Sequence, residues 1–243
     1  RLGSGPRGAR GRRRRRGRGS RRRAHRVARR GGSGLMSGVM GMTSAEIDGA
    51  GDRRVPHRFS YWEMLVSSVL GLIASLVLSI EALALAADPT AGLSCDISSK
   101  ISCSVVGVSW QANLLGFPNA FLGLVSEPVV ITVAVAALGG VRFPRWFMAT
   151  AQAFYAIGFG FAIWLFLQAY FDIGALCPWC LLVTVTTTLV FASMTRVNLL
   201  DNNLGLPPRV HEAVTRWLRL GADTWAVVII IAVMAGMVIY QYL

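Results

Sequence analysis

The sequence has 243 residues, 53% of them hydrophobic, and a formal net charge of +13. Much of the positive charge lies before the first apolar stretch, in runs such as Arg12 to Arg16, whereas the apolar stretches carry almost no charge. This combination excludes an ordinary soluble domain and predicts a protein of the lipid bilayer.

Residues 1 to about 58 are rich in Gly, Arg and Ser and show no apolar periodicity, so we expect a disordered cytoplasmic segment. Basic residues ahead of a first membrane span commonly hold that end in the cytoplasm. We prefer this interpretation to a nucleic-acid-binding arm and expect no nucleic-acid partner. The sequence begins with Arg, which makes Met36, Met40 and Met42 candidate biological starts.

Five apolar stretches follow, near residues 61–87, 117–138, 146–171, 176–195 and 222–242. Each is long enough to cross about 30 Å of hydrocarbon as an α-helix that rises about 1.5 Å per residue. Helices satisfy their own backbone hydrogen bonds inside the bilayer, so we expect an all-α integral membrane protein. Residues 207–220 have the pattern of a short amphipathic helix on the cytoplasmic surface.

The arginines predict the orientation of these spans. They precede the first span and lie between the second and third and between the fourth and fifth, as Arg53, Arg54, Arg58, Arg142, Arg145, Arg196, Arg209, Arg216 and Arg219. Positively charged segments remain in the cytoplasm. We therefore expect a multi-pass protein of the plasma (inner) membrane with a cytoplasmic N-terminus. The segments 88–116 and 172–175 should face the opposite side.

All four cysteines fall on this extracytoplasmic side, where disulfides form and persist. Cys95 and Cys103 follow the first span, while Cys177 and Cys180 open the fourth in the motif Cys-Pro-Trp-Cys. A CxxC motif at a helix start suits redox chemistry, because the N-terminal amides stabilise the attacking thiolate. Static disulfides, packed apolar cysteines and a zinc site are the alternatives. The spacing of Cys95 and Cys103 fits a zinc knuckle poorly, so we expect no metal.

Several motifs resemble, in order and spacing, the vitamin K epoxide reductase (VKOR) family. They are the run Cys-Asp-Ile-Ser-Ser-Lys-Ile-Ser-Cys-Ser from Cys95 to Ser104, Ser109, the run Asn-Ala-Phe-Leu-Gly from Asn119, and the late CPWC. The likeness covers about residues 61–195. It implies a four-helix bundle around a quinone that is entered from the extracytoplasmic side. Many bacterial members carry a fifth span, as this sequence does in our interpretation.

The resemblance also implies a division of the chain and of the cysteines. Residues 59–200 would form the catalytic domain, and residues 201–243 the amphipathic segment and the fifth span. Cys177 and Cys180 would be the active-site pair, with Cys180 nearest the quinone. Cys95 and Cys103 would be the shuttle pair on the loop.

Further roles follow from the resemblance for individual polar residues. Ser109 would be a hydrogen-bonding residue of the loop and Asn119 a donor to a quinone carbonyl. From the residues alone, Ser109 would be a solvated loop serine and Asn119 could equally cap the second span. Glu81 and Glu127 lie within spans and are candidates for function, although we expect Glu81 to reach water at the outer interface and assign no role to either.

The resemblance implies a thiol oxidoreductase that reoxidises a DsbA-like thioredoxin-fold partner and reduces a quinone, either menaquinone or ubiquinone. Some animal members have a tyrosine four residues after CxxC, where this sequence has Thr184, which argues against epoxide reduction. Many bacterial members carry a fused thioredoxin-like domain; this sequence ends at Leu243, so we expect a separate partner. The alternatives are a DsbB-like analogue, in which the CxxC pair comes first, and a non-catalytic membrane protein with structural disulfides.

Overall fold

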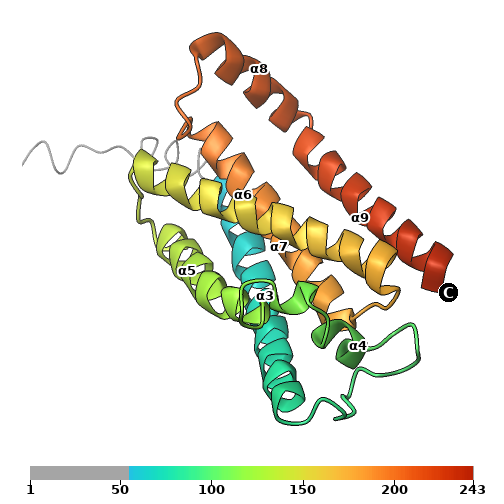
Figure 1. Ribbon diagram of the computed structural model, residues 1–243. Helices are drawn as coiled ribbons and strands as arrows, with labels where there is room; N and C mark the ends of the chain where they lie inside the picture. Colours follow the sequence, from blue (N-terminus) through green and yellow to red (C-terminus); the bar gives the residue numbers. More distant parts are fainter. Residues whose placement is uncertain (1–54, 243) are drawn as a thin grey trace, which may run out of the picture. The chain divides into compact units, whose positions relative to one another are not determined.

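The computed structural model describes residues 55–242, and nearly all of the segment that we expect to be disordered lies outside them. The long helices are α3 (Val55–Ala87), α5 (Ala120–Leu138), α6 (Arg145–Gln168), α7 (Pro178–Leu200) and α9 (Ala222–Tyr242) (Figure 1). The short ones are α4 (Cys103–Gly107), η1 (Gln111–Asn113), the π-helix η2 (Ala169–Ile173) and α8 (Pro208–Arg219). Residues 55–242 contain no strand, and the predicted all-α class is confirmed.

Five helices are long and apolar enough to cross a membrane: His57–Ala87, Ala120–Leu138, Arg145–Ile173, Pro178–Leu200 and Ala222–Gln241. They confirm the five predicted spans, with differences only at the ends. The fourth span begins at Pro178 because Cys177 has an extended backbone and caps the helix. Proline suits the first helical turn, where its missing N–H would have no partner in any case.

Helices α3, α5, α6 and α7 form a four-helix bundle. Helix α3 packs against both α5 and α7, and α6 packs against α7. Their shared core consists of the buried residues Met64, Val130, Ala134, Tyr155, Val190 and Met194. At Gly123 of α5 an added Cβ atom would lie 2.0 Å from Ser75 Oγ of α3, so the two helices approach too closely for a larger residue. Such small-residue contacts are typical of helix packing in membranes.

The fifth span, α9, lies outside this bundle against α7. Met234 of α9 is buried with Phe166 and Leu176, whereas most of the helix is exposed in the absence of lipid. At the C-terminal end of α9, Gln241 Nε2 donates to the carbonyl of Tyr170 at 3.2 Å, and Lys100 Nζ donates to the carbonyl of Gln241 at 3.3 Å. The fifth helix therefore contacts the cysteine-bearing loop directly.

The bundle has two chemically different ends. At one end, His57 Nε2 at the start of α3 lies 3.0 Å from Asp201 Oδ1 just after α7. This end also carries the α5–α6 connection, because Arg145 donates a hydrogen bond to the carbonyl of Asn202. The arginine-bearing segments thus gather at one end of the bundle, and the cysteine-bearing segments lie at the other.

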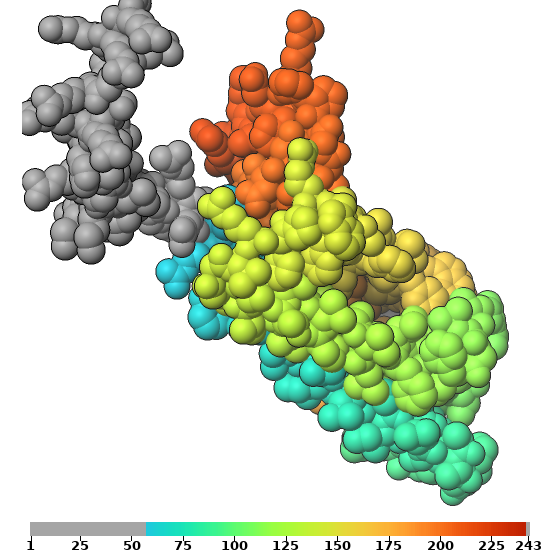
Figure 2. Space-filling model, turned by 90° about the vertical axis from the view of Figure 1, so that its left-hand side faces the viewer, coloured from blue at the N-terminus to red at the C-terminus, as the bar shows by residue number. Residues whose placement is uncertain are grey.

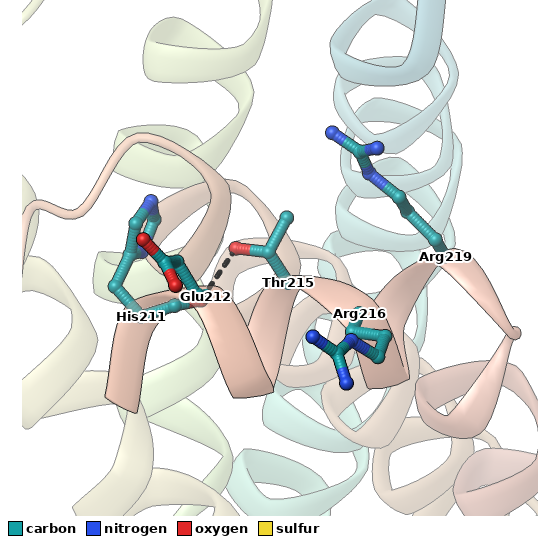
Figure 3. A pocket seen from close by; sticks show the side chains of 5 residues that line it. All are labelled: His211, Glu212, Thr215, Arg216 and Arg219. Carbon is teal, nitrogen blue, oxygen red and sulfur yellow. Dashed lines mark hydrogen bonds between the residues drawn. The ribbon is translucent and has the colours of Figure 1, made fainter. Parts of the chain in front are cut away.

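Helix α8 is the amphipathic helix that the sequence predicts between the fourth and fifth spans. It buries Leu218 while Trp217 remains 65% exposed. A surface pocket on α8 is lined by His211, Glu212, Thr215, Arg216 and Arg219 (Figure 3). The Thr215 hydroxyl in this pocket donates to the carbonyl of His211 at 2.7 Å. The pocket contains no cysteine and belongs to the arginine-bearing end, so it is separate from the thiols.

Candidate redox site

The first cysteine pair is oxidised and lies in the segment between α3 and α5. Cys95 and Cys103 form a disulfide with a Cα–Cα distance of 5.7 Å, and both residues are buried. Cys103 is the first residue of α4, and the hydroxyl of the preceding Ser102 caps this helix by accepting from the amide of Val105 at 3.2 Å. The cap fixes the start of the helix and therefore the direction in which the Cys103 side chain points.

Asp96 organises the loop that carries this disulfide. Its carboxylate accepts from the Ser102 hydroxyl at 2.7 Å, from the amide of Ser104 at 3.0 Å and from the amide of Leu93 at 2.8 Å, and also from the Ser104 hydroxyl. Burial alone would raise the pKa of Asp96, but these hydrogen bonds outweigh burial and hold the pKa well below its ordinary value. The Asp96 carboxylate is therefore charged at neutral pH and holds the loop together through these hydrogen bonds.

The second pair opens α7 and consists of two free cysteines. Cys177 is 1% exposed and caps the helix, since its Sγ accepts from the amide of Cys180 at 3.3 Å. The pKa of the Cys177 thiol is lowered, chiefly by the hydrogen bond from the Cys180 side chain and further by the amides of Cys180 and Trp179. Burial and the nearby Glu81 oppose this shift. The sequence argument for a stabilised thiolate at the start of this helix is consistent with this geometry.

A short backbone bridge holds the loop against the start of α7. Ile101 and Leu176 form an isolated parallel β-bridge. The amide of Leu176 donates to the carbonyl of Lys100 at 2.9 Å, and the amide of Ser102 donates to the carbonyl of Leu176 at 3.0 Å. In each segment the residues of the bridge lead directly into a cysteine, so the bridge aligns the two pairs.

As a result, Cys103 Sγ lies 3.2 Å from Cys177 Sγ. Both sulfurs are buried in one apolar cluster that also includes Cys95, Val106 and Ala175. Thiol–disulfide exchange requires a thiolate to approach one sulfur of a disulfide, and the leaving group is the other sulfur. The loop disulfide and the CPWC thiols are therefore in position for direct exchange through Cys103 and Cys177.

Glu81 also belongs to this site, although the sequence alone offered no reason to assign it a role. It lies in α3, is 9% exposed, and its Oε1 and Oε2 atoms are 3.3 Å and 3.6 Å from Cys95 Sγ. The carboxylate thus faces the disulfide rather than water at the outer interface. The signal in the sequence was its position near the predicted extracytoplasmic end of the span that precedes Cys95.

This cluster does not support the zinc alternative. The ligand atoms of Glu81, Cys95 and Cys103 all lie within 4.8 Å of one another. However, two of them are joined in a disulfide, and zinc is bound by thiolates, which a disulfide does not offer.

Ser109 and Asn119 shape the segment between α4 and α5. The Ser109 hydroxyl donates to the carbonyl of Val106 at 2.6 Å and accepts from the amide of Ala112 at 3.3 Å. Asn119 precedes α5, but its side chain makes no capping bond. Instead, Asn119 Nδ2 donates to the carbonyl of Gln111 at 2.6 Å, while Oδ1 is buried without a partner among the described residues.

The surroundings of Asn119 fit a quinone head group. Its amide keeps one N–H and one carbonyl oxygen that could meet a quinone carbonyl or a quinol hydroxyl. The side chain of Gln111 is bonded to Asp172 of η2, which ties this segment to the chain just before Cys177. In the view of Figure 2 the surface is hollowed between α6 (gold) and the green segment that leads into α5.

The two remaining polar candidates within spans have internal partners. Glu127 is 4% exposed in the bundle, and its Oε1 accepts from the Tyr155 hydroxyl at 3.1 Å. Thr184 donates to the carbonyl of Cys180 at 2.9 Å, one helical turn earlier. The Thr184 hydroxyl therefore has its hydrogen-bond partner within its own helix.

Together, a bundle of membrane-spanning helices and two adjoining cysteine pairs define a multi-pass membrane thiol oxidoreductase. The family model described as the vitamin K epoxide reductase family matches residues 62–195, more than half of the chain. The chain belongs to this family, whose members oxidise thiols with a quinone as acceptor and typically work with thioredoxin-like partners. A comparison with curated proteins finds no match.

Proposed function

We propose that this protein reoxidises a separate soluble thioredoxin-fold protein of the DsbA type and thereby supports disulfide bond formation. Electrons pass from the partner to Cys95 and Cys103, then to Cys177 and Cys180, and finally to menaquinone or ubiquinone. The observation that carries this proposal is the 3.2 Å separation between Cys103 Sγ and Cys177 Sγ, since only neighbouring sulfurs can exchange.

The proposed location is the plasma (inner) membrane, with the N-terminus in the cytoplasm and all four cysteines on the extracytoplasmic face. The alternation of arginine along the five spans supports this orientation. This orientation suits the chemistry, because the partner becomes reduced when it makes disulfides in its substrates, and those disulfides persist in an oxidising compartment.

In the first half of the cycle, a partner thiolate attacks Cys95 Sγ, the Cys95–Cys103 bond breaks, and Cys103 takes the electron pair. The second partner thiol then displaces Cys95, which leaves the partner oxidised and the loop pair reduced. The contact of Cys103 with Cys177 supports attack at Cys95 rather than at Cys103. Ile97, which is 73% exposed two residues after Cys95, offers the partner an apolar contact.

In the second half, Cys103 attacks Cys177 of the oxidised CPWC pair, and Cys180 takes the electron pair. Cys95 then attacks Cys103 and releases Cys177, which restores the loop disulfide and leaves the CPWC dithiol. The bound quinone supplies the two-electron acceptor for this dithiol. A DsbA-type disulfide, at about −120 mV, requires an acceptor more oxidising than itself, and a membrane quinone meets that condition.

Two polar residues support this electron relay from the partner through the two cysteine pairs to the quinone. Asn119 would hold a quinone carbonyl through the N–H that Gln111 does not use, and the bond to the carbonyl of Gln111 orients the amide. Ser109 keeps the loop folded through its bonds to Val106 and Ala112. Both roles depend on neighbouring contacts rather than on the residues in isolation.

The direct test supplies purified protein with a reduced DsbA-type protein and a quinone, and follows quinone reduction by its ultraviolet absorbance. We expect turnover that requires both the partner and the quinone, with a Cys180→Ala variant as the inactive control. A correctly folded wild-type protein that reduces no quinone under these conditions would favour purely structural disulfides.

A further inference from the structure

Glu81 is in contact with a reacting sulfur and yet has no part in the electron relay. Its two carboxylate oxygens lie 3.3 Å and 3.6 Å from Cys95 Sγ, and both residues are buried. A carboxylate in an apolar cluster next to a disulfide gains no hydrogen bond from the oxidised sulfur. The contact becomes favourable when Cys95 is reduced, because the S–H group can then donate a hydrogen bond to the carboxylate.

The relay requires Cys95 to gain and lose a proton in every cycle. Cys95 leaves as a thiolate when the partner is released, and it must be a thiolate again when it attacks Cys103. An ordinary thiol has a pKa of about 8.5, so only a small percentage is ionised at neutral pH. Cys177 has helix amides that favour its thiolate, but Cys95 lies in a loop and its carboxylate neighbour disfavours a free negative charge.

We propose that Glu81 is the general acid and general base for Cys95, an inference that rests on the function proposed above. As the partner leaves, its second thiolate attacks its sulfur that is bonded to Cys95, the disulfide of the partner forms, the bond to Cys95 breaks, and Cys95 Sγ takes the electron pair. The protonated Glu81 transfers its proton to this sulfur, which gives a Cys95 thiol and a Glu81 carboxylate.

The return step reverses this transfer. The Glu81 carboxylate removes the proton from the Cys95 thiol as Cys95 Sγ attacks Cys103 Sγ. The Cys103–Cys177 bond breaks, Cys177 Sγ takes the electron pair, and the Cys95–Cys103 bond forms again. Glu81 ends the cycle protonated, as it began, so one proton moves back and forth within a single contact.

The other ionisable groups near Glu81 cannot take over this task. Those that face or influence it are Cys95, Cys103, Cys177, Cys180 and Asp96. The cysteines are the exchanging groups themselves. Asp96 already accepts hydrogen bonds from Ser102, Ser104 and Leu93, which occupy its carboxylate. Glu81 is the carboxylate in direct contact with the Cys95 sulfur.

The test compares the pH dependence of partner-driven quinone reduction in the wild type and in Glu81→Gln, Glu81→Asp and Glu63→Gln variants. Glutamine keeps the size and polarity of the side chain but cannot carry the proton. We expect Glu81→Gln to lower kcat about 100-fold at neutral pH, the lower end of the range for general acid–base catalysis. Its remaining activity should rise about tenfold per pH unit towards the thiol pKa of about 8.5, as the thiolate forms unaided.

The wild type should have a nearly flat profile over the same range, because the carboxylate removes the proton. Glu81→Asp keeps a carboxylate one methylene shorter, so it should keep the flat profile at a reduced rate. This variant also keeps the proposal testable if Glu81→Gln does not fold. Glu63→Gln, the same change in the same helix, should match the wild type.

Two results would overturn the inference. One is a Glu81→Gln variant with the wild-type rate and profile. The other is an equal loss in the Gln and Asp variants with no change in the shape of the profile, which would indicate a packing role. Failure of the wild type to oxidise the partner would instead refute the proposed function, so the two failures can be told apart.

Discussion

Ile101 and Leu176 form a parallel β-bridge that joins the loop of one cysteine pair to the start of the helix that carries the other. Its two backbone hydrogen bonds, from Leu176 to Lys100 and from Ser102 to Leu176, measure 2.9 and 3.0 Å. A loop that was free to move would bring its sulfur to Cys177 only occasionally. The bridge removes that freedom in advance, which is how a proximity effect accelerates exchange.

The first prediction concerns this bridge. Leu176→Pro removes the amide that donates to Lys100, whereas Leu176→Ala keeps it. Because one hydrogen bond contributes roughly 1 kcal/mol, we expect Leu176→Pro to slow exchange between the cysteine pairs about fivefold. Acid quenching followed by non-reducing peptide mapping measures this rate. Equal slowing by Leu176→Ala would mean that side-chain packing, not the bridge, aligns the pairs.

The second prediction concerns the sulfurs that exchange. A Cys180→Ala variant should hold a Cys103–Cys177 disulfide in exchange with the Cys95–Cys103 disulfide across the 3.2 Å contact, because Cys180 can no longer attack Cys177 while Cys95 can still attack Cys103. With a mild thiol oxidant to take up the two electrons, a Cys95→Ala/Cys180→Ala double variant should form the same bond almost completely, because no other thiol remains to resolve it. Non-reducing mass spectrometry identifies the linked peptides, and a predominant Cys95–Cys177 link would contradict the proposed order.

The third prediction separates the two pairs by substrate. Cys95→Ala should lose oxidation of the protein partner, since the attacked sulfur is absent, yet retain measurable quinone reduction by a small membrane-permeant dithiol that reaches CPWC directly. Cys180→Ala should lose both reactions. Quinone absorbance with each reductant decides the matter. Loss of both reactions in Cys95→Ala would place Cys95 in the quinone-reducing step instead.

The fourth prediction is a pH dependence. The pKa of Cys177 is lowered, so its thiolate should persist below the ordinary thiol pKa of about 8.5 and be lost as the pH falls through the lowered value. Ultraviolet thiolate absorbance of a reduced Cys95→Ala/Cys103→Ala variant should show this midpoint. Adding Cys180→Ala should raise the midpoint, because the largest stabilising hydrogen bond is removed. An unchanged midpoint would assign the shift to the helix amides alone.

The fifth prediction is topological. A membrane-impermeant thiol reagent applied to intact cells or spheroplasts should label an Ile97→Cys variant from outside, because Ile97 is 73% exposed in the loop of the first cysteine pair and the arginine pattern predicts the opposite end in the cytoplasm. Labelling from the cytoplasmic side of inverted vesicles should be weak. The reverse pattern would invert the proposed orientation.

Much of the fold could be predicted because it depends on local composition. The apolar stretches are long enough to identify the spans without any knowledge of their neighbours. The amphipathic pattern of residues 207–220 likewise gives α8. The start of α7 was less certain: the apolar stretch includes Leu176, but this residue pairs with Ile101 instead of joining the helix. Such a pairing has no local signal.

The site was only partly predictable. The four cysteines are conspicuous in the sequence, whereas the short helix α4 that begins at Cys103 and its cap Ser102 were not predicted. The contact of Glu81 with Cys95 was not foreseen, because an acidic residue near the end of a span can face water, lipid headgroups or the protein. Only the rotation of α3 and the course of the following loop decide among these directions.

The sequence by itself determined the number of spans, the membrane class and the segments that carry the thiols, since hydrophobicity and charge act residue by residue along the chain. The tertiary structure alone decided the 3.2 Å distance between Cys103 Sγ and Cys177 Sγ, two residues 74 positions apart. The physical reason is that this contact depends on the packing of α3 against α7 and on a backbone bridge, whose partners are chosen by the fold as a whole.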